Sequence, residues 1–396
     1  MIGLLAVPVA CGVLQALAAS RLVARFAGQP PATPPARPPI TVLKPLHGNE
    51  PLLEEALTTL CRQDYPAWQI VFGVANPADP AVAVVERLRA RFPDRDIALV
   101  VNPARHGANG KIGNIINMFP AARHDVLVIA DSDVHARPDW LDCLVAALQQ
   151  PDVGLVTMLY AGLPATPSLV ARLGATQITH GFLPGAVLAR ALGRNDCLGA
   201  TMCLRRSHLL RIGGFHALVN HLADDQVLGR RIAALGLRVV LAQTVVLTTV
   251  PETTLRDLFR HELRWARTIR ALEPLGFAAS VLQYPIAWAL LAVLLSGGDA
   301  RAMVLFMAAW ALRAIAALGV DRSLSRRRAL AFPCPVWLLP LRDALSIIVM
   351  IASYGGRRVI WRGHGLEADT PGRVAGTART TSTAPALHPS GETNTR

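Results

Sequence analysis

Short apolar runs and amphipathic stretches alternate along the chain between Ile40 and Leu159. The apolar runs are rich in valine and isoleucine, which is typical of buried strands, and the stretches between them favour helices. Strict alternation of strands and helices predicts an α/β domain with a doubly wound, parallel sheet. The predicted strands are Ile40–Leu43, Gln69–Ala75, Ile97–Asn102, the run ending at Asp131, and Val153–Leu159; the predicted helices follow Pro51 and Lys111 and cover Ala81–Arg91 and Pro138–Gln149.

The alternation stops after Leu159. The segment Leu169–Leu192 is apolar and is interrupted by a histidine and a proline. Two interpretations stay open for it: a segment that lies on or against a membrane surface, and a helix in the core of a soluble domain. Further along, the sequence predicts helices at Asp224–Leu235 and Thr254–Ala271.

An uncharged apolar run, Ile2–Ala19, lies near the N-terminus, and Arg21 and Arg25 follow it. Basic residues after a span hold that flank in the cytoplasm, so we expect a transmembrane anchor. The alternative is a cleaved signal peptide. A signal peptide would carry positive charge before its apolar run, and here there is none.

Three more apolar stretches lie beyond Pro274. Leu275–Ser296 and Ala302–Val320 are long enough to cross a bilayer. The third stretch, Val336–Tyr354, carries an adjacent arginine and aspartate, Arg342 and Asp343, near its middle. Because charges are costly in lipid, this stretch either packs the pair together inside a helix bundle or lies at the interface.

The composition supports a membrane protein. Hydrophobic residues make up 52% of the 396 residues, charged residues only 17%, and the mean hydropathy is +0.36. The net charge of +13 is spread out or lies beside apolar segments, without a nucleic-acid-binding motif, so we predict no nucleic-acid partner. Six cysteines without a Cys-x-x-Cys pair indicate neither a zinc site nor a disulfide framework. We therefore divide the chain into an anchor (1–22), a Pro-rich linker (23–39), an α/β domain (40–273), a C-terminal membrane region with two to three helices (274–360) and a disordered tail (361–396). We expect the chain in the inner membrane with the α/β domain in the cytoplasm.

Two acidic pairs are the main candidates for chemistry. Asp131 and Asp133 come directly after a buried strand, where they can hold a divalent cation and its phosphate ligand. A polar turn is the alternative reading for this pair alone. Asp224 and Asp225 open a predicted helix, whose N-terminus favours the ionised form, and Asp225 is the candidate base, with Asp224 as the second choice. Helix capping is the alternative for this pair.

A basic helix follows the acidic pairs. Arg264 and Trp265 lie on the predicted helix Thr254–Ala271, which carries four further arginines. A solvated basic face is the ordinary interpretation of such a run. This helix, however, directly precedes the membrane region, where arginine can bind phosphate bidentately and tryptophan prefers the interface. We therefore expect Arg264 to stabilise a diphosphate.

Five motifs in this order resemble the family 2/21 inverting glycosyltransferases, which include ceramide glucosyltransferase and the hopanoid-biosynthesis glycosyltransferase. The resemblance covers roughly residues 40–273 and extends to the membrane layout. In this sequence the motifs are Thr41–Gly48, Gly107–Asn114, Asp131–Asp133, Asp224-Asp225 and His261-x-x-Arg264-Trp265.

The resemblance implies a GT-A fold with a nucleotide-sugar donor at the end of the sheet. Asp131 corresponds to the family's second conserved aspartate, Asp225 to its third, which is the base, and Arg264-Trp265 to its Q/R-x-x-R-W motif. The segment Asn195–Leu204 resembles the acceptor side. The resemblance assigns donor binding to Lys44, Pro45, Asn109, Lys111 and Asn114.

Two positions depart from the family pattern. Asn76 stands where the family has its first aspartate, which contacts uracil; an amide can still form a hydrogen bond to uracil. His261 replaces the usual glutamine or arginine, and its imidazole can still donate to phosphate. We keep both residues among the expected donor-binding groups.

These predictions describe a membrane-bound, metal-dependent inverting enzyme that moves a sugar from a UDP-sugar to a hydroxyl of a membrane lipid, with Mg²⁺ or Mn²⁺ as cofactor. The resemblance favours N-acetylglucosamine and a bacteriohopanoid polyol, with glucose on ceramide or another lipid as the alternative. A membrane transporter or scaffold is a hypothesis of another class. A processive polysaccharide synthase shares the chemistry but usually needs more spans.

Overall fold

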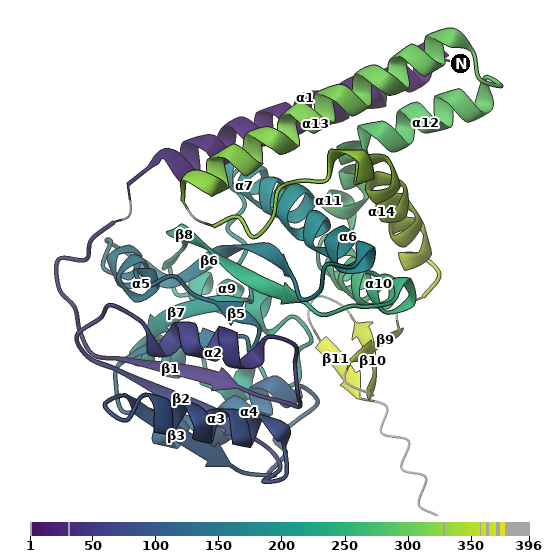
Figure 1. The fold of residues 1–396 in the computed structure, drawn as a ribbon. Helices are drawn as coiled ribbons and strands as arrows, with labels where there is room; N and C mark the ends of the chain where they lie inside the picture. Colours follow the sequence, from purple (N-terminus) through teal and green to yellow (C-terminus); the bar gives the residue numbers. More distant parts are fainter. Residues whose placement is uncertain are drawn as a thin grey trace, which may run out of the picture.

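The computed structural model describes residues 2–30, 32–327 and 329–356, together with three strands between 358 and 376 (Figure 1). An α/β domain forms one part of the molecule, and long helices from both ends of the chain form the other. The main sheet has eight strands in the order β3-β2-β1-β4-β7-β6-β8-β5.

The first half of the sheet is parallel, as predicted. β1 pairs with β2 and β4, and β2 pairs with β3, all in parallel register. These strands carry the apolar runs of the sequence, and alternate side chains pack against helices on opposite faces. Their bounds are β1 Ile40–Pro45, β2 Trp68–Val74, β3 Asp96–Val101 and β4 Val126–Ala130.

The second half of the sheet is mixed, which differs from the all-parallel arrangement expected from the alternation. β7 (Thr201–Arg205) runs antiparallel to both β4 and β6 (Val153–Pro164). β8 (Arg238–Val250) is parallel to β6, and the short β5 (Val134–His135) is antiparallel to β8. The chain re-enters the sheet at the same end of the strands at which β6 leaves it, so β7 runs antiparallel to β6.

Helices cover both faces of this sheet. One face packs against α2, α3 and α5, around the fully buried Trp140, and the other against α4 and α9. Asp79 caps α3, and Asn109 caps α4, through side-chain bonds to backbone N–H groups. The bounds are α2 Leu53–Cys61, α3 Pro80–Arg91, α4 Gly110–Met118, α5 Trp140–Leu148, α8 Arg206–Arg211 and α9 Asp224–Ala234, with 3-10 turns η1 Phe119–Ala121 and η3 Phe215–Ala217.

The segment Leu169–Leu192 is helical and lies between the two parts of the molecule. It consists of α6 (Leu169–Gln177), a π-helical turn η2 (Ile178–Phe182) and α7 (Leu183–Ala191). α6 and η2 contact β6, and α7 contacts the N-terminal helix α1. The segment therefore packs against the apolar helices on one side and against the sheet on the other.

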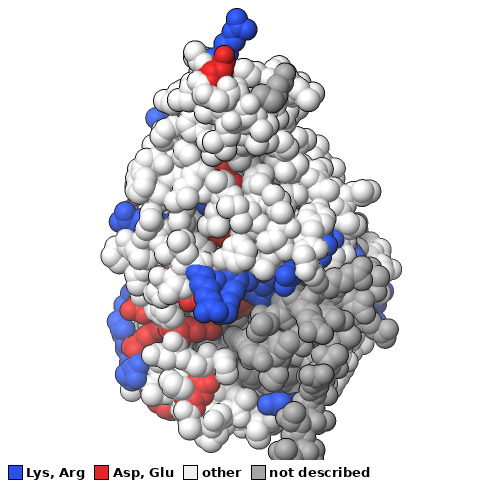
Figure 2. All heavy atoms as spheres, turned by 90° about the vertical axis from the view of Figure 1, so that its right-hand side faces the viewer, with Lys and Arg blue, Asp and Glu red and all other residues white. Residues whose placement is uncertain are grey.

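Among the described residues, three helices are long and apolar enough to cross a membrane: α1 (Ile2–Gly28), α13 (Ala300–Arg326) and the stretch Val336–Ser353, which contains the 3-10 turn η5 (Val336–Leu338) and α14 (Leu339–Ser353). α1 continues to Gly28, so the helix takes up the first residues of the predicted linker. α1 lies along α13 and α12 (Figure 1). Figure 2 shows that this part is largely uncharged below its tip, and that Lys and Arg gather in a band where it meets the α/β domain.

The predicted span Leu275–Ser296 is broken. α11 (Pro274–Ala279) and the turn η4 (Ser280–Gln283) form one arm, and α12 (Pro285–Leu295) forms the other, with a bend of 67° between them. The cause is Pro285, which disfavours the helical conformation at the preceding residue, and Tyr284 is accordingly outside it at φ −110° and ψ 65°.

The predicted disordered tail needs a correction. Strands β9 (Arg358–Trp361), β10 (His364–Asp369) and β11 (Arg373–Gly376) form a small antiparallel sheet. β9 carries an adjacent valine and isoleucine, which favour a strand. Residues 377–396 lie outside the described part of the chain.

Candidate active site

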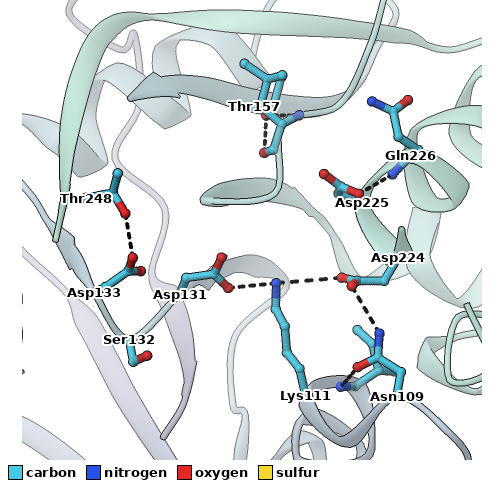
Figure 3. A network of polar contacts seen from close by, with 12 residues as sticks. Asn109, Lys111, Asp131, Ser132, Asp133, Thr157, Asp224, Asp225, Gln226 and Thr248 are labelled. Carbon is cyan, nitrogen blue, oxygen red and sulfur yellow. Dashed lines mark hydrogen bonds and ion pairs between the residues drawn. The ribbon is translucent and has the colours of Figure 1, made fainter. Parts of the chain in front are cut away.

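Polar side chains from three elements meet at the edge of the sheet where β4 ends (Figure 3). Asp131 directly follows β4, and its Oδ1 lies 2.7 Å from Lys111 Nζ in the first turn of α4. The same Nζ is 3.7 Å from Asp224 Oδ2 at the start of α9. Burial alone would lower the pKa of Lys111, but Asp131 and Asp224 outweigh it and raise the pKa above its usual value. A permanent positive charge therefore lies between two carboxylates.

Asp133 lies deeper in the same loop. Its Oδ2 accepts a hydrogen bond from Thr248 Oγ1, and Val134 beside it pairs with Thr248 in the sheet. Burial first, and then the nearby Asp131 carboxylate, raise the pKa of Asp133 to about 6. The two aspartates predicted to hold a cation are thus close enough to affect each other electrostatically.

Lys44 lies beneath this loop. Its side chain is fully buried, and Nζ donates to the Val134 carbonyl at 3.2 Å. Burial lowers the pKa of Lys44 to about 8, against the attraction of Asp133, Asp131 and Glu50. The resemblance assigns Lys44 to donor binding, which stays a prediction; in the structure its ammonium group holds the acidic loop.

Asp224 and Asp225 do not cap their helix, because the N-cap position is Ala223. Asp224 is buried and also accepts from Asn109 Nδ2 at 3.1 Å. Asp225 is half-buried, and its Oδ1 accepts from the Gln226 N–H at 2.8 Å. Burial, followed by the Asp224 charge, raises the pKa of Asp225 to about 7, although Lys111 opposes the shift. A carboxyl group with a pKa near neutrality suits a general base.

Gly199 approaches the Asp225 carboxylate closely. A Cβ atom at this position would lie 2.9 Å from Asp225 Oδ2, which is closer than two such atoms normally approach. Because glycine has no side chain, it leaves room for the carboxylate. Gly199 belongs to the segment Asn195–Leu204, which resembles the family's acceptor side.

The other predicted donor-binding residues of the α/β domain mainly hold loops. Asn109 joins α4 to the His221 carbonyl and to Asp224, and Asn114 Nδ2 donates to the Gly73 carbonyl at 2.8 Å. Pro45 is buried at the end of β1. Asn76 is exposed after β2, and its Oδ1 accepts from the Ala78 N–H in a local turn.

The basic motif lies on α10 (Leu255–Leu272). His261 Nδ1 contacts Glu252, and its ring meets the Trp265 ring edge-on, with centroids 4.6 Å apart. Trp265 packs in an apolar cluster with Ile178 of η2 and with Tyr160. Arg264 is half-buried on the same helix.

Glu262, within this motif, has a role that the sequence did not indicate. Its two carboxylate oxygens lie 2.7 Å from Arg342 Nη1 and Nη2, and both residues are buried. Arg342 and Asp343 are both inside the helix bundle, as one interpretation expected, but they are not each other's partner. Adjacent residues on a helix point in different directions, so Arg342 pairs with α10 instead.

Three further contacts of the site were not predicted from the sequence. Ser132 donates to Glu50, which follows β1. Thr248 holds Asp133. Tyr160 of β6 stacks on Phe182, with centroids 4.5 Å apart, and burial, Asp225 and Asp131 together raise its pKa, which keeps the phenol protonated. The sequence contained one indication of Tyr160: it lies near the end of an apolar strand, where ligands bind in sheets of this kind.

Comparison with known proteins identifies the family. A family model described as glycosyl transferase family 21 matches residues 3–374. The chain belongs to this family. Over 247 residues it is 23% identical to ceramide glucosyltransferase 1 of Caenorhabditis elegans, covering 61% of this chain and 52% of that protein. It is also 23% identical over 239 residues to an N-acetylglucosaminyltransferase of Rhizobium leguminosarum bv. viciae, covering 58% of this chain and 55% of that one. The chain spans about half the length of these curated relatives.

The family 21 chain also shares its fold with a solved glycosyltransferase. The mannosyltransferase PcManGT from Pyrobaculum calidifontis, in complex with GDP-Man and Mn²⁺, matches with a TM-score of 0.52 and 22% identity. The match covers 89% of this chain and 99% of the other. This likeness shows a GT-A-type fold, as predicted.

The carboxylates of this family 21 site fit a cation held jointly with a substrate. Within the described residues, no three His, Cys, Asp or Glu side chains converge into a metal site of their own. Mg²⁺ is commonly held by one or two carboxylates together with substrate phosphates. Asp131, with 37% of its side chain exposed, and Asp133 provide that number of ligands.

Proposed function

We propose that this chain is a membrane-bound inverting glycosyltransferase that transfers N-acetylglucosamine from UDP-N-acetylglucosamine to a hydroxyl of a membrane lipid, a bacteriohopanoid polyol. The observation that carries the proposal is the site itself. A carboxyl group with a near-neutral pKa, Asp225, lies beside the row Asp131–Lys111–Asp224. That combination provides a base, a cation site and a fixed positive charge.

In this proposal Asp225 accepts the proton of the acceptor hydroxyl. The hydroxyl oxygen bonds to the anomeric carbon from the face opposite the diphosphate. The bond from the anomeric carbon to the diphosphate oxygen breaks, its electron pair leaves with UDP, and the configuration inverts. General-base assistance of this kind contributes about 10²–10⁴ in rate.

The negative charge that develops on UDP needs compensation. Lys111 carries a positive charge at the edge of the sheet. Arg264 is close enough to Tyr160 to lower its pKa, while Asp225 and Asp131 raise it. Arg264 therefore adds a second positive charge near these carboxylates. A Mg²⁺ or Mn²⁺ ion bound through Asp131 and Asp133 would neutralise the diphosphate.

The position of the site supports a lipid acceptor. Trp265 and Tyr160 pack with η2, which belongs to the segment between the sheet and the apolar helices. An acceptor embedded in a bilayer can reach such a site, whereas a soluble acceptor would gain nothing from this position. Basic residues near the C-terminal ends of α1 and α13 support a cytoplasmic catalytic domain at the inner membrane.

Glucose transfer to ceramide is the second candidate, because several similar proteins are named ceramide glucosyltransferase. An acceptor panel separates the two. Detergent-purified protein receives labelled UDP-N-acetylglucosamine or UDP-glucose with Mn²⁺, and a hopanoid polyol, ceramide or a short oligosaccharide, with Asp225→Asn as control. Label in the hopanoid polyol supports the proposal, label in ceramide supports the second candidate, and label only in the oligosaccharide contradicts both.

UDP binding tests the non-enzymatic alternatives. A transporter or scaffold with an inert domain would not bind UDP in a manner that depends on Mn²⁺ and on Asp131. Calorimetry of the purified chain with UDP, with and without Mn²⁺, makes that comparison. Mass spectrometry of membrane lipids from cells with and without the protein would then identify the product.

A further inference from the structure

A polar cavity lies among the apolar helices, away from the acidic site. It is bounded by α1, by η2 and the start of α7, by α13 and α14, and by the break before α12. Its volume is about 40 Å³. Because one water-sized group needs about 10–15 Å³, it holds roughly three such groups.

The backbone around the cavity departs from regular helix at two places. η2 is a π-helical turn, a feature that occurs frequently at functional sites. The 67° break at Tyr284 also borders the cavity. At the depth of a membrane, irregular backbone is tolerated only where it is buried in protein or lines a cavity, and broken helices of this kind build binding sites in membrane proteins.

Polar side chains point to the same place. Between Ile2 and Ala19, Gln15 is the one residue with an amide, hydroxyl or charge, and it lines the cavity. His180 is buried with 3% of its surface exposed, and its Nδ1 has no hydrogen-bond partner within the described residues. Arg313 and Asp343 also line the cavity, and within the described residues Arg313 Nε and Asp343 Oδ2 have no hydrogen-bond partner either. Polar groups of this kind are costly in lipid and indicate a function.

Each arginine around the cavity has an acidic group to compensate it. Arg342 is paired with Glu262, and Arg313 is close enough to Asp343 to attract it electrostatically. A further carboxylate, Asp321, lies 3.3 Å from His180 Nε2 and accepts from the Cys334 N–H. Arg313 Nη2 donates to the His180 carbonyl at 2.7 Å. No excess positive charge is left for a phosphate or carboxylate. The remaining donors and acceptors, including the Gln15 and Gln283 amides, suit an uncharged ligand with hydroxyl or amide groups.

One turn of helix joins this cavity to the candidate active site. His180 and Gly181 of η2 line the cavity. Phe182 of the same turn stacks on Tyr160, and Ile178 packs in the cluster that contains Trp265. A ligand in the cavity is therefore separated from the site by η2 alone.

We propose that this cavity binds the polar head group of an uncharged membrane lipid that carries hydroxyl or amide groups. Gln15 and Gln283 lie at its half-buried rim, and His180, Arg313 and Asp343 lie deeper. The proposal goes beyond the proposed function, because a head group in this cavity lies apart from Asp225 and is not the hydroxyl that receives the sugar. Binding itself does not require sugar transfer, so the two can fail separately.

Two substitutions test the proposal: one fills the cavity and the other removes a polar group from it, and neither changes the acidic site. Gly185 lines the cavity, and a Cβ atom there would meet only Gln283 Oε1, at 3.8 Å, so Gly185→Leu has room for its first atom and occupies the cavity with the rest. Gln15→Leu removes an amide from an apolar helix. Gly3→Leu is the matched control, because Gly3 is exposed on α1 with nothing within 4 Å.

The measurement is native mass spectrometry of the full chain with a hopanoid polyol, ceramide or the anionic lipid phosphatidylglycerol added, alongside UDP affinity. We expect Gly185→Leu to weaken binding of a neutral lipid about tenfold or more, and Gln15→Leu about threefold to tenfold, the effect of a lost hydrogen bond. Gly3→Leu should bind as the wild type, and all three should keep UDP affinity.

Two results would overturn the inference: equal binding of neutral lipids by all three variants and the wild type, or preferential binding of phosphatidylglycerol. A wild type that binds a neutral lipid in this cavity but transfers no sugar would contradict the proposed function and leave this inference standing.

Discussion

The molecule contains two groups of inward-facing charges, and they differ in their balance. At the edge of the sheet, carboxylates outnumber ammonium groups: Asp131, Asp133, Asp224, Asp225 and Glu50 surround Lys111 and Lys44. Among the helices, Glu262 and Arg342 form a two-bond ion pair, Arg313 lies near Asp343, and Asp321 is held by His180 and by the Cys334 N–H.

This difference indicates which group needs a charged ligand. Excess negative charge raises the pKa of Asp133 to about 6 and that of Asp225 to about 7, on top of the effect of burial. A divalent cation would relieve that repulsion, and a proton from a hydroxyl would neutralise Asp225. The balanced group needs no ion, so it can hold α10 against α14 and accommodate a neutral ligand.

Replacement of the base should have the largest effect. Asp225→Asn removes the group that accepts the hydroxyl proton, so kcat should fall by about 10²–10⁴ while UDP affinity is kept. Steady-state transfer and UDP calorimetry measure the two effects. A normal kcat would move the base elsewhere, with Asp224→Asn as the next variant.

Asp133→Asn addresses the excess negative charge itself. It keeps the size of the side chain but removes a carboxylate ligand, so the chain should fold normally and lose most of its transfer activity and its Mn²⁺-dependent UDP binding. Melting temperature provides the control for folding. Full turnover by this variant in the presence of a chelator would eliminate the metal role.

Glu262→Gln should turn the balanced group into an unbalanced one. Arg342 would then be buried without its counter-charge, which costs about 3–5 kcal/mol of stability. The double variant Glu262→Leu with Arg342→Met should recover much of the loss, because it removes both charges. Denaturation in detergent measures both proteins, and an unchanged stability of the single variant would show that the pair does not hold α10.

Gly199→Ala should displace the Asp225 carboxylate without changing a charge. Its Cβ would lie 2.9 Å from Oδ2, and a catalytic group displaced by about 1 Å can cost about 10²-fold in rate, so we expect kcat to fall by about 10- to 10²-fold. UDP affinity should be unchanged. A variant as fast as the wild type would mean that Asp225 can move without consequence.

The pH profile gives the mildest test. Burial and Asp224 raise the pKa of Asp225 to about 7, and the base is active only when ionised. The value of kcat/KM should therefore fall as the pH drops through about 7, to roughly a tenth of its plateau at about pH 6. A profile that stays flat down to about pH 5, or that rises on acidification, would contradict a base with a raised pKa.

The sequence allowed a correct prediction of the elements that depend on local pattern. The apolar run Val126–Ala130 predicted a buried strand, and the rule that ligands bind at the carboxyl ends of such strands placed Asp131 at a site. The Asp224-Asp225 helix start was equally visible. In each case adjacent residues carry the whole signal.

Contacts between distant residues could not be predicted in this way. Nothing periodic links Thr248 to Asp133 or Glu262 to Arg342, since these pairs form only when the sheet and the helices are assembled. The adjacency of Arg342 and Asp343 even suggested the wrong partner. The break at Tyr284, by contrast, had a local cause in Pro285, and the length of the apolar run concealed it.

The configuration of the product tests the central claim most directly. The account requires one displacement at the anomeric carbon, with Asp225 as base. UDP-N-acetylglucosamine labelled with ¹³C at that carbon, incubated with the purified chain, Mn²⁺ and a hopanoid polyol, should yield a lipid glycoside with inverted, β configuration by NMR. An α-configured glycoside, or label recovered only as UDP-N-acetylglucosamine and free sugar, would contradict the account.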